Sequence, residues 1–217
     1  QQQELLEVLQ KFEVVFESTL GDWKCEPVDI ELKAQNCKPV HAKPYNVQQS
    51  QEKKLKAEVE RLMSYQVLKK VNTCKRASPA FTIAKPDGSL RSLTNNREIN
   101  KLIRRHPFPI PKIQEMLHKL ESFMWATSLD LNKGYYQIRL SKTASKICPI
   151  VFPWGKYAYL RLPMGLCNSP DIFQEKMNDL MCNLEFTRAY LDDLLVISKG
   201  TYAEHLEHLE TVLARLS

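Results

Sequence analysis

The sequence has no apolar run long enough to cross a bilayer, and no charged segment followed by an apolar leader. A spanning helix needs about 20 consecutive apolar residues, so neither a membrane nor a secretory protein is expected. No cysteine belongs to a CxxC pair, which excludes a zinc knuckle and a disulfide framework and favours a reducing compartment. The cysteines are Cys25, Cys37, Cys74, Cys148, Cys167 and Cys182. Internal repeats and low-complexity tracts are also absent.

The charge balance is modestly basic, with 31 Lys and Arg against 25 Asp and Glu, a net charge of +6. This excess suits a polyanionic partner, but a solvated basic surface explains it equally well. A chain of 217 residues can bury a sizeable core, and we expect one domain with a subdivision. The first residue is not Met and the last apolar pattern runs to the end, so we expect a piece of a longer polypeptide.

Two adjacent carboxylates, Asp192 and Asp193, lie inside an apolar, β-prone run over residues 186–198. Unpaired burial of these charges would be costly. A divalent cation would offset that cost, because Mg²⁺ prefers carboxylate and phosphate oxygens. Neighbouring side chains on a strand face opposite ways, so we expect a hairpin whose tip holds both acids. The alternative is an ordinary surface turn, where Asp is common.

Apolar spacing predicts amphipathic helices over residues 5–16 and 55–63, the second capped by Ser50, and a last helix over residues 206–216. Residues 29–32 and 40–45 are predicted to be extended, and three prolines make residues 107–111 an extended connector before a helix over 112–120. Ser169, Pro170 and Asp171 predict a helix start with Ser169 as the cap.

Strands are expected in three regions. Pro86 and Gly88 mark the turn of a hairpin within residues 78–100. Residues 123–140 are β-prone on both sides of Asn132 to Gly134, and residues 147–162 alternate around a turn at Trp154 and Gly155.

Asp130 places a third acid in a β-prone run, 62 residues before Asp192. Adjacent strands would bring the three carboxylates together. Two-metal phosphoryl transfer needs such a cluster, in which two cations lie about 3.5–4 Å apart. Taken alone, Asp130 is more often a turn or capping acid than a metal ligand.

Three runs occur in order along the chain: TSLDLNKGYYQI from Thr127, LPMGLCNSPDIFQ from Leu162, and YLDD from Tyr190. Together they resemble the successive motifs of reverse transcriptases, and most closely those of gypsy-like LTR retrotransposons, which are related to the retroviral polymerases. The resemblance extends from Val28 to Leu216.

The resemblance implies an α+β, right-handed polymerase fold with fingers, and a palm whose antiparallel sheet is backed by helices. It implies an N-terminal helical extension over residues 1–27, fingers and the first palm segment over 28–106, and the catalytic palm over 107–217. The thumb, a ribonuclease H and an integrase would follow Ser217, and an aspartic protease would precede the chain.

The resemblance also implies the site. Asp130, Asp192 and Asp193 match the catalytic and metal-binding triad, with Leu131 lending a backbone carbonyl, for two Mg²⁺ ions with Mn²⁺ as an alternative. The residues implied to contact the dNTP are Lys85, Arg91, Lys133, Gly134, Tyr135, Met164 and Gly165. Among these, Tyr135 matches the aromatic gate that excludes a 2′-hydroxyl. Those implied to contact template or primer are Asn100, Asn168, Ser169, Pro170 and Tyr190.

The implied function is RNA- and DNA-directed DNA synthesis, with an RNA or DNA template, a primer and dNTPs as partners. No membrane is expected, and the implied location is intracellular and cytoplasmic, in virus-like particles. The run Thr94-Asn95-Asn96 departs from the family's Val-Asp-Tyr-Arg pattern, so a decayed or domesticated copy that binds nucleic acid without polymerising is the alternative. A two-metal nuclease is a weaker rival because it needs no gate at Tyr135. His205 and His208 are read as part of a charged helix face and not as metal ligands.

Overall fold

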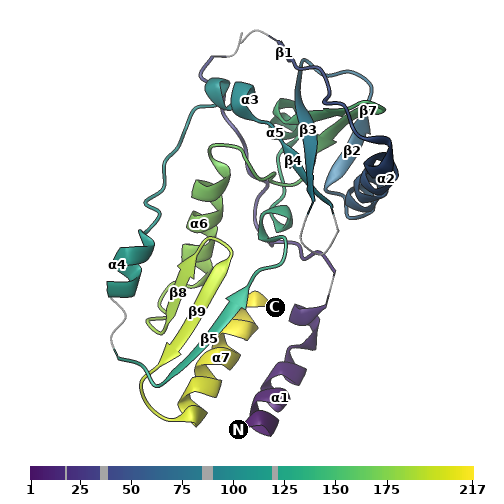
Figure 1. Cartoon of the computed structure of the whole chain (residues 1–217). Helices are drawn as coiled ribbons and strands as arrows, with labels where there is room; N and C mark the ends of the chain where they lie inside the picture. The colour runs from purple at the N-terminus through teal and green to yellow at the C-terminus, as the bar shows by residue number, and fades with distance from the viewer. Residues whose placement is uncertain (18, 35–38, 85–89, 119–121) are drawn as a thin grey trace. The chain divides into compact units, whose positions relative to one another are not determined.

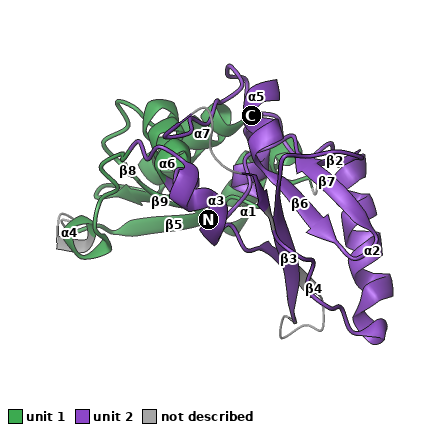
Figure 2. Ribbon diagram, turned by 90° about the horizontal axis from the view of Figure 1, so that it is seen from above, with its two compact units in different colours: residues 1–19, 107–132, 171–217 green, residues 20–106, 133–170 purple. Residues whose placement is uncertain are grey.

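The computed structural model describes residues 1–17, 19–34, 39–84, 90–118 and 122–217. The chain divides into two compact units, coloured separately in Figure 2. The first unit comprises Gln1–Thr19, Pro107–Asn132 and Asp171–Ser217, and the second comprises Leu20–His106 and Lys133–Pro170. The predicted division at residues 27 and 106 stays a prediction.

The first unit is built on a three-stranded antiparallel sheet of order β5-β9-β8 (Figure 1). Its strands are β5 (Trp125–Asp130), β8 (Thr187–Tyr190) and β9 (Asp193–Ser198). Its helices are α1 (Gln2–Lys11), η1 (Glu13–Phe16), α4 (Ile113–His118), most of α6 (Ser169–Leu180) and α7 (Tyr202–Leu216). The predicted hairpin around the acids and the predicted last helix are confirmed.

The two faces of β5 differ in exposure because side chains alternate along a strand. Trp125, Thr127 and Leu129 are half-buried, whereas Ala126, Ser128 and Asp130 are exposed. Helix α7 packs on the half-buried face, where the rings of Trp125 and Tyr202 lie 4.8 Å apart. The face that bears Asp130 is therefore the more exposed face of β5.

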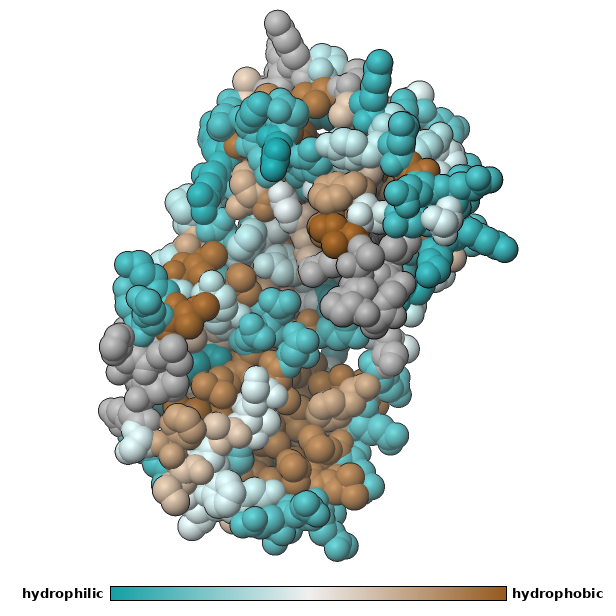
Figure 3. All heavy atoms as spheres, viewed as in Figure 1, coloured by the Kyte–Doolittle hydropathy of each residue, from teal (hydrophilic) through white to brown (hydrophobic). Residues whose placement is uncertain are grey.

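Apolar side chains also remain on the surface of the first unit. Figure 3 shows them gathered over the region of α1, β5 and α7. Leu6 on α1 is 54% exposed, and Met124, just before β5, is 73% exposed. No helix within the described ranges is both long and apolar enough to span a membrane.

A buried polar cluster joins α7 to the sheet. His205, only 4% exposed, lies 2.8 Å through Nε2 from Oγ1 of Thr127 and 2.9 Å through Nδ1 from Oγ of Ser198. Nδ1 of His208 lies 2.7 Å from the same serine hydroxyl, and its ring stacks on Phe186 at 3.8 Å. The pair expected to lie on a charged helix face is therefore a packing cluster in contact with the sheet.

Acid is expected to weaken the first unit through this cluster. Burial, and then the nearby His208, lower the pKa of His205, so the folded protein holds this imidazole neutral. The unfolded chain takes up the proton near pH 6.5, and stability rises with pH where the unfolded state binds more protons. The contribution is complete above about pH 6.5 and is lost as the pH falls below it. Urea unfolding at pH 7.5 and 5.0 should show a smaller loss for His205→Gln than for the unsubstituted chain, and equal losses would contradict the prediction.

The second unit holds a sheet of order β1-β3-β6-β7-β2, with β4 paired to β3. Its strands are β1 (Val40–His41), β2 (Leu68–Val71), β3 (Arg76–Ala84), β4 (Leu90–Thr94), β6 (Pro149–Phe152) and β7 (Gly155–Tyr159). Its helices are α2 (Gln49–Ser64), α3 (Arg97–Leu102), η2 (Gly134–Gln137) and α5 (Lys142–Ile147). Both predicted hairpins, β3–β4 and β6–β7, are confirmed. The turn at residues 85–88 lies outside the described residues.

Three local predictions are wrong. Helix α2 begins at Gln49 with Gln48 as its cap, so Ser50 lies inside the helix. Helix α6 begins at Ser169 itself, whose hydroxyl donates to the carbonyl of Pro163 at 2.7 Å. The strand predicted directly after Gly134 is instead the 3₁₀ helix η2, because Lys133 adopts a left-handed conformation (φ 55°) that interrupts the extended chain.

Candidate active site

The β8–β9 hairpin ends in a two-residue turn, Leu191 and Asp192, because Tyr190 pairs directly with Asp193. Leu191 has a φ of 52°, and two-residue hairpin turns need a positive φ at this first position. The amide of Leu131, just after β5, donates to the carbonyl of Asp192 at 2.9 Å. The turn is thereby joined to the end of the neighbouring strand.

Asp130 and Asp193 are direct partners across the antiparallel β5–β9 pair. Directly opposed residues share a face of the sheet, with Cβ atoms about 4.5–5.5 Å apart. Both are exposed, and Asp192 in the adjoining turn is half-buried. The three predicted acids therefore lie at one end of one sheet.

Like charges in opposed positions repel each other, and no hydrogen bond or ion pair between described side chains engages these carboxylates. A bound cation would relieve the repulsion, and carboxylate oxygens are the ligands that Mg²⁺ prefers. Over the described ranges, no three His, Cys, Asp or Glu side chains are already grouped closely enough to hold a metal ion. The chemistry of the acids fits a divalent cation, and the side chains would have to converge on it.

Gln174 of α6 holds the hairpin from behind. Its side chain is fully buried, its Oε1 accepts from the amide of Leu191 at 2.8 Å, and its Nε2 donates to the carbonyl of Ala189 at 3.0 Å. Sequence reasoning assigned Gln174 no function. The available signal was a glutamine on the apolar helix face of Phe173 and Met177, since a buried amide must find hydrogen-bond partners.

A cavity of about 190 Å³ opens on the face of the first unit that carries Asp193. Met116 of α4, Ser128 of β5 and Leu195 of β9 contribute to its lining, and so does Tyr190. Tyr190, predicted to contact template or primer, therefore lies at this cavity beside an acid of the candidate site.

In the second unit, three residues expected to contact the dNTP are Lys133, which has a left-handed backbone conformation, and Gly134 and Tyr135, which begin the helix η2. Nζ of Lys133 lies 5.0 Å from the ring centre of Tyr65. Gly134 and Tyr135 are buried, with Tyr135 7% exposed. The next residue, Tyr136, stacks on Tyr159 at 6.3 Å.

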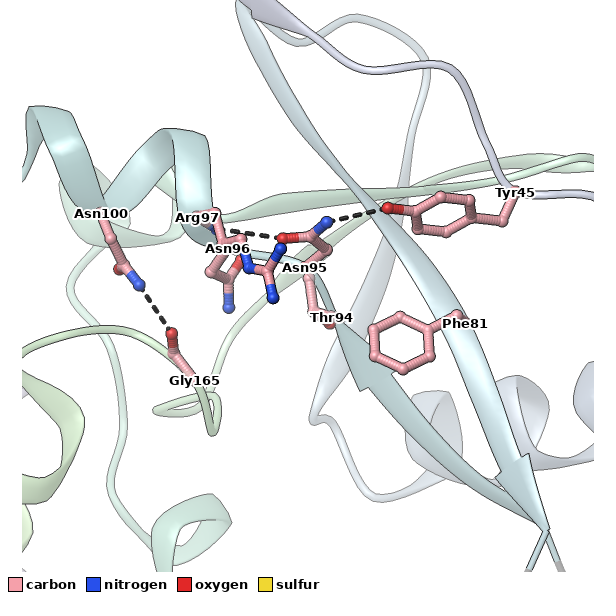
Figure 4. Close-up of a pocket in the computed structure, with 8 residues that line it drawn as sticks. All are labelled: Tyr45, Phe81, Thr94, Asn95, Asn96, Arg97, Asn100 and Gly165. Atoms are coloured by element: carbon pink, nitrogen blue, oxygen red, sulfur yellow. Dashed lines mark hydrogen bonds between the residues drawn. The ribbon is translucent and has the colours of Figure 1, made fainter.

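Met164 and Gly165 form a tight turn held by two asparagines. Gly165 has a φ of 88°, a conformation that favours glycine. Its carbonyl accepts from Nδ2 of Asn100 at 2.9 Å (Figure 4), and the carbonyl of Met164 accepts from Nδ2 of Asn96 at 3.4 Å. Asn100 also accepts from the amide of Cys167 at 3.0 Å. Asn100, predicted to contact the template, therefore holds the turn of Met164 and Gly165 that is predicted to lie under the nucleotide.

The predicted template residues Asn168 and Ser169 are buried, at 4% and 0% exposed. Asn168 donates to the carbonyl of Arg104 at 2.9 Å, and Ser169 donates to Pro163, as described above. Pro170 follows in the first turn of α6, half-buried. The two polar side chains hold the loop that leads into the helix, and their contact with a template stays a prediction.

A larger cavity of about 540 Å³ lies in the second unit beside the same asparagines. Its lining combines rings and polar side chains, as Figure 4 shows: Tyr45, Phe81, Thr94, Asn95, Asn96, Arg97, Asn100 and Gly165. Asn95 donates to the hydroxyl of Tyr45 at 2.8 Å. Rings, amides and one guanidinium suit an unpaired nucleotide.

Two further predicted dNTP contacts are Lys85 and Arg91. Lys85 lies outside the described residues. The backbone of Arg91 pairs with Ile83 in the β3–β4 hairpin, which places this residue on a strand near the hairpin end.

Burial raises the pKa of Cys148 to about 12, so this thiol stays protonated and offers no nucleophile.

Known proteins resemble this chain in both sequence and structure. The chain is 29% identical over 185 residues to the Retrovirus-related Pol polyprotein from transposon 297 of Drosophila melanogaster, and 29% identical over 224 residues to that from transposon opus. These matches cover 82% and 99% of the chain but only 17% and 22% of the polyproteins.

The solved structures that resemble the chain include the Prototype Foamy Virus Protease-Reverse Transcriptase CSH mutant, with a TM-score of 0.90 at 24% identity. They also include the foamy viral protease-reverse transcriptase in complex with dsDNA, with a TM-score of 0.90 at 25% identity. Each match covers 99% of this chain, and 29% and 45% of those chains. The predicted α+β polymerase fold is confirmed.

The family model of "Reverse transcriptase (RNA-dependent DNA polymerase)" matches residues 83–217. This range is more than half of the chain and includes Asp130, Asp192 and Asp193. The chain therefore belongs to the reverse transcriptase family.

Proposed function

We propose that these residues belong to the RNA- and DNA-directed DNA polymerase of a gypsy-like LTR retrotransposon. The observation that carries the proposal is the direct pairing of Asp130 with Asp193 at the end of the sheet whose adjoining turn holds Asp192. In the reaction, the primer 3′-oxygen forms a bond to the α-phosphorus of a dNTP, the bond to the β-phosphate breaks, and pyrophosphate leaves.

Asp130, Asp192 and Asp193 would hold two Mg²⁺ ions, with Mn²⁺ as an alternative and the carbonyl of Leu131 as a further ligand. Such ions lower the pKa of the attacking hydroxyl and neutralise charge on the leaving oxygen. The protein contributes a rigid backbone frame, because the β5–β9 ladder and Gln174 fix the main chain that carries the acids, and the carboxylates would converge on the ions from that frame.

The dNTP is proposed to contact Lys85 and Arg91 through its phosphates, since guanidinium and ammonium groups suit phosphate oxygens. Amides near Lys133 and Gly134 would also approach the triphosphate, and Met164 and Gly165 would form the floor under the nucleotide. The ring of Tyr135 would exclude a 2′-hydroxyl and so favour deoxynucleotides.

The template and primer are proposed to contact Asn100, Asn168, Ser169, Pro170 and Tyr190. The 540 Å³ cavity beside Asn100 supports this assignment, since it offers rings for stacking and amides for base edges. The relatives are named as polyproteins, which supports a protease, a ribonuclease H and an integrase as neighbours. A cytoplasmic, particle-bound location completes the proposal.

Primer extension tests the proposal. The polymerase that contains these residues should extend a DNA primer on RNA and DNA templates with dNTPs and Mg²⁺. Removing the metal with EDTA should lower the rate by more than about a thousandfold, and restoring Mg²⁺ should recover it.

The outcome that would contradict this proposal is salt-sensitive binding of the template and primer without any product. That result would favour the alternative of a decayed or domesticated copy. The segment Thr94 to Asn96, which motivated the alternative, makes hydrogen bonds to Tyr159, Tyr45 and Met164. These bonds hold the residues that differ from the family pattern firmly in the second unit, which supports a copy that is able to polymerise.

A further inference from the structure

The N-terminal segment of the second unit runs along the residues that end η2, the short helix of Tyr135. The amide of Trp23 donates to the carbonyl of Gln137, the last residue of η2, at 2.9 Å. The amide of Val28 then donates to the carbonyl of Arg139 at 2.8 Å. At Gly21 the fit is close, because an added Cβ would lie 3.2 Å from Cδ of Gln137.

Asp22 in this segment binds two arginines that lie more than 100 residues away in the sequence. Its Oδ1 accepts from Nε of Arg139 at 2.8 Å and from Nη1 of Arg161 at 2.7 Å. Its Oδ2 accepts from Nη2 of Arg139. The hydrogen bonds from Arg139, assisted by the charge of Arg161, lower the pKa of Asp22, so the carboxylate stays ionised at neutral pH.

Arg161 connects this carboxylate to η2. Its side chain is only 8% exposed, and the same Nη1 that meets Asp22 also donates to the carbonyl of Gln137 at 3.2 Å. A buried guanidinium needs a counter-charge. Asp22 supplies that charge, and Arg161 can then remain at the end of η2.

The end of η2 determines where Tyr135 lies. The helix has only four residues, with the amide of Tyr136 bound to the carbonyl of Lys133 at 2.9 Å and the amide of Ile138 bound to that of Tyr135 at 3.2 Å. So short a helix has few internal bonds, and its position depends on the groups that hold its ends. Gln137 receives two of those bonds, one from Trp23 and one from Arg161.

We propose that Asp22 is a positioning residue for Tyr135, the aromatic gate that excludes a 2′-hydroxyl. Asp22 neutralises Arg161, and Arg161 holds Gln137 and with it the ring of Tyr135. This inference rests on the proposed polymerase function for its consequence, the exclusion of ribonucleotides. Loss of Asp22 leaves a buried, unpaired guanidinium that must turn toward water, and the carbonyl of Gln137 then loses one of its two bonds.

The first experiment measures sugar discrimination by the polymerase that contains these residues. Asp22→Asn should raise the ratio of kcat/KM for a ribonucleotide to that for the matching deoxynucleotide about tenfold, since ångström-scale misplacement changes rates by up to about a hundredfold. The change should appear mainly in the KM for the ribonucleotide. Asp22→Glu should restore part of the discrimination.

Asp29→Asn is the matched control. This carboxylate lies in the same segment and accepts from the hydroxyl of Ser141 at 2.7 Å, away from η2. The control should leave the ratio within about twofold of the unsubstituted enzyme, the scatter expected away from the gate. Equal ratios for Asp22→Asn and Asp29→Asn would overturn the inference.

A second background keeps the test decisive if Asp22→Asn unfolds the protein. In Arg161→Met no buried charge remains to be neutralised, so adding Asp22→Asn should change the ratio no further. A further change in this background would show that Asp22 acts by another route and would overturn the inference.

Hydrogen exchange separates this inference from the proposed function, because it needs no catalysis. The amides of Tyr136 and Ile138 should exchange about tenfold faster in Asp22→Asn and at the unsubstituted rate in Asp29→Asn. Unchanged exchange would overturn the positioning by Asp22. Absence of primer extension by the unsubstituted enzyme would instead refute the polymerase function.

Discussion

Replacing Asp192 by Asn is expected to reduce primer extension by at least about a thousandfold, because the site loses one of its carboxylates and with it much of its attraction for Mg²⁺. An amide has the same shape but no charge, and only one of its two terminal atoms can be a metal ligand. The backbone bonds of the turn, from Leu131 to Asp192 and from Leu191 to Gln174, do not involve the replaced group. The unfolding free energy should therefore change by less than about 0.5 kcal/mol.

The measurement is single-nucleotide extension with saturating Mg²⁺, together with urea unfolding and template binding. Asp179→Asn is a suitable control, since Asp179 is an exposed acid on α6 in the same unit. It should retain full activity. Undiminished extension by Asp192→Asn would refute the assignment of the triad.

The second large effect is expected at Gln174. Gln174→Leu keeps a buried side chain of similar size but removes the groups that bind the amide of Leu191 and the carbonyl of Ala189. Each buried backbone group left without a partner costs about 1–3 kcal/mol, so the unfolding free energy should fall by about 2–4 kcal/mol. Because the turn carries Asp192, kcat should also fall about a hundredfold.

Urea unfolding and steady-state kinetics measure the two effects separately. Asn178→Ala is the matched control: Asn178 accepts from Nε2 of Gln174 at 2.9 Å but is exposed, so its loss should cost less than about 1 kcal/mol. Full activity and stability in Gln174→Leu would show that the sheet alone holds the turn.

Much of the candidate site could be predicted from the sequence because its signals are local. Two adjacent acids in an apolar run predicted the hairpin, and the spacing of apolar residues predicted α1, α2 and α7. The order of the three motif runs then pointed to the polymerase family, which the profile match confirmed. The hairpin and helix signals depend only on residues close together in the chain, and the motif order needs no knowledge of the tertiary structure.

Local propensity misled the prediction where backbone geometry or distant contacts dominate. Tyr135 to Gln137 are β-prone, yet the left-handed Lys133 and two bonds at Gln137 make this segment a 3₁₀ helix. Ser169 resembles a helix cap, but its hydroxyl is committed to Pro163. In both cases the deciding bond or backbone conformation forms only in the folded chain.

The sequence by itself indicated which acids belong to the proposed site, because carboxylates in β-prone apolar runs need a counter-charge wherever they lie. Only the tertiary structure decided that Asp130 lies opposite Asp193, since strand register depends on pairing between segments far apart in the chain. The same holds for Gln174 behind the turn and for Asp22 at Arg161. The functions proposed for them rest on hydrogen bonds to distant backbone and charge, and folding alone brings those partners within reach.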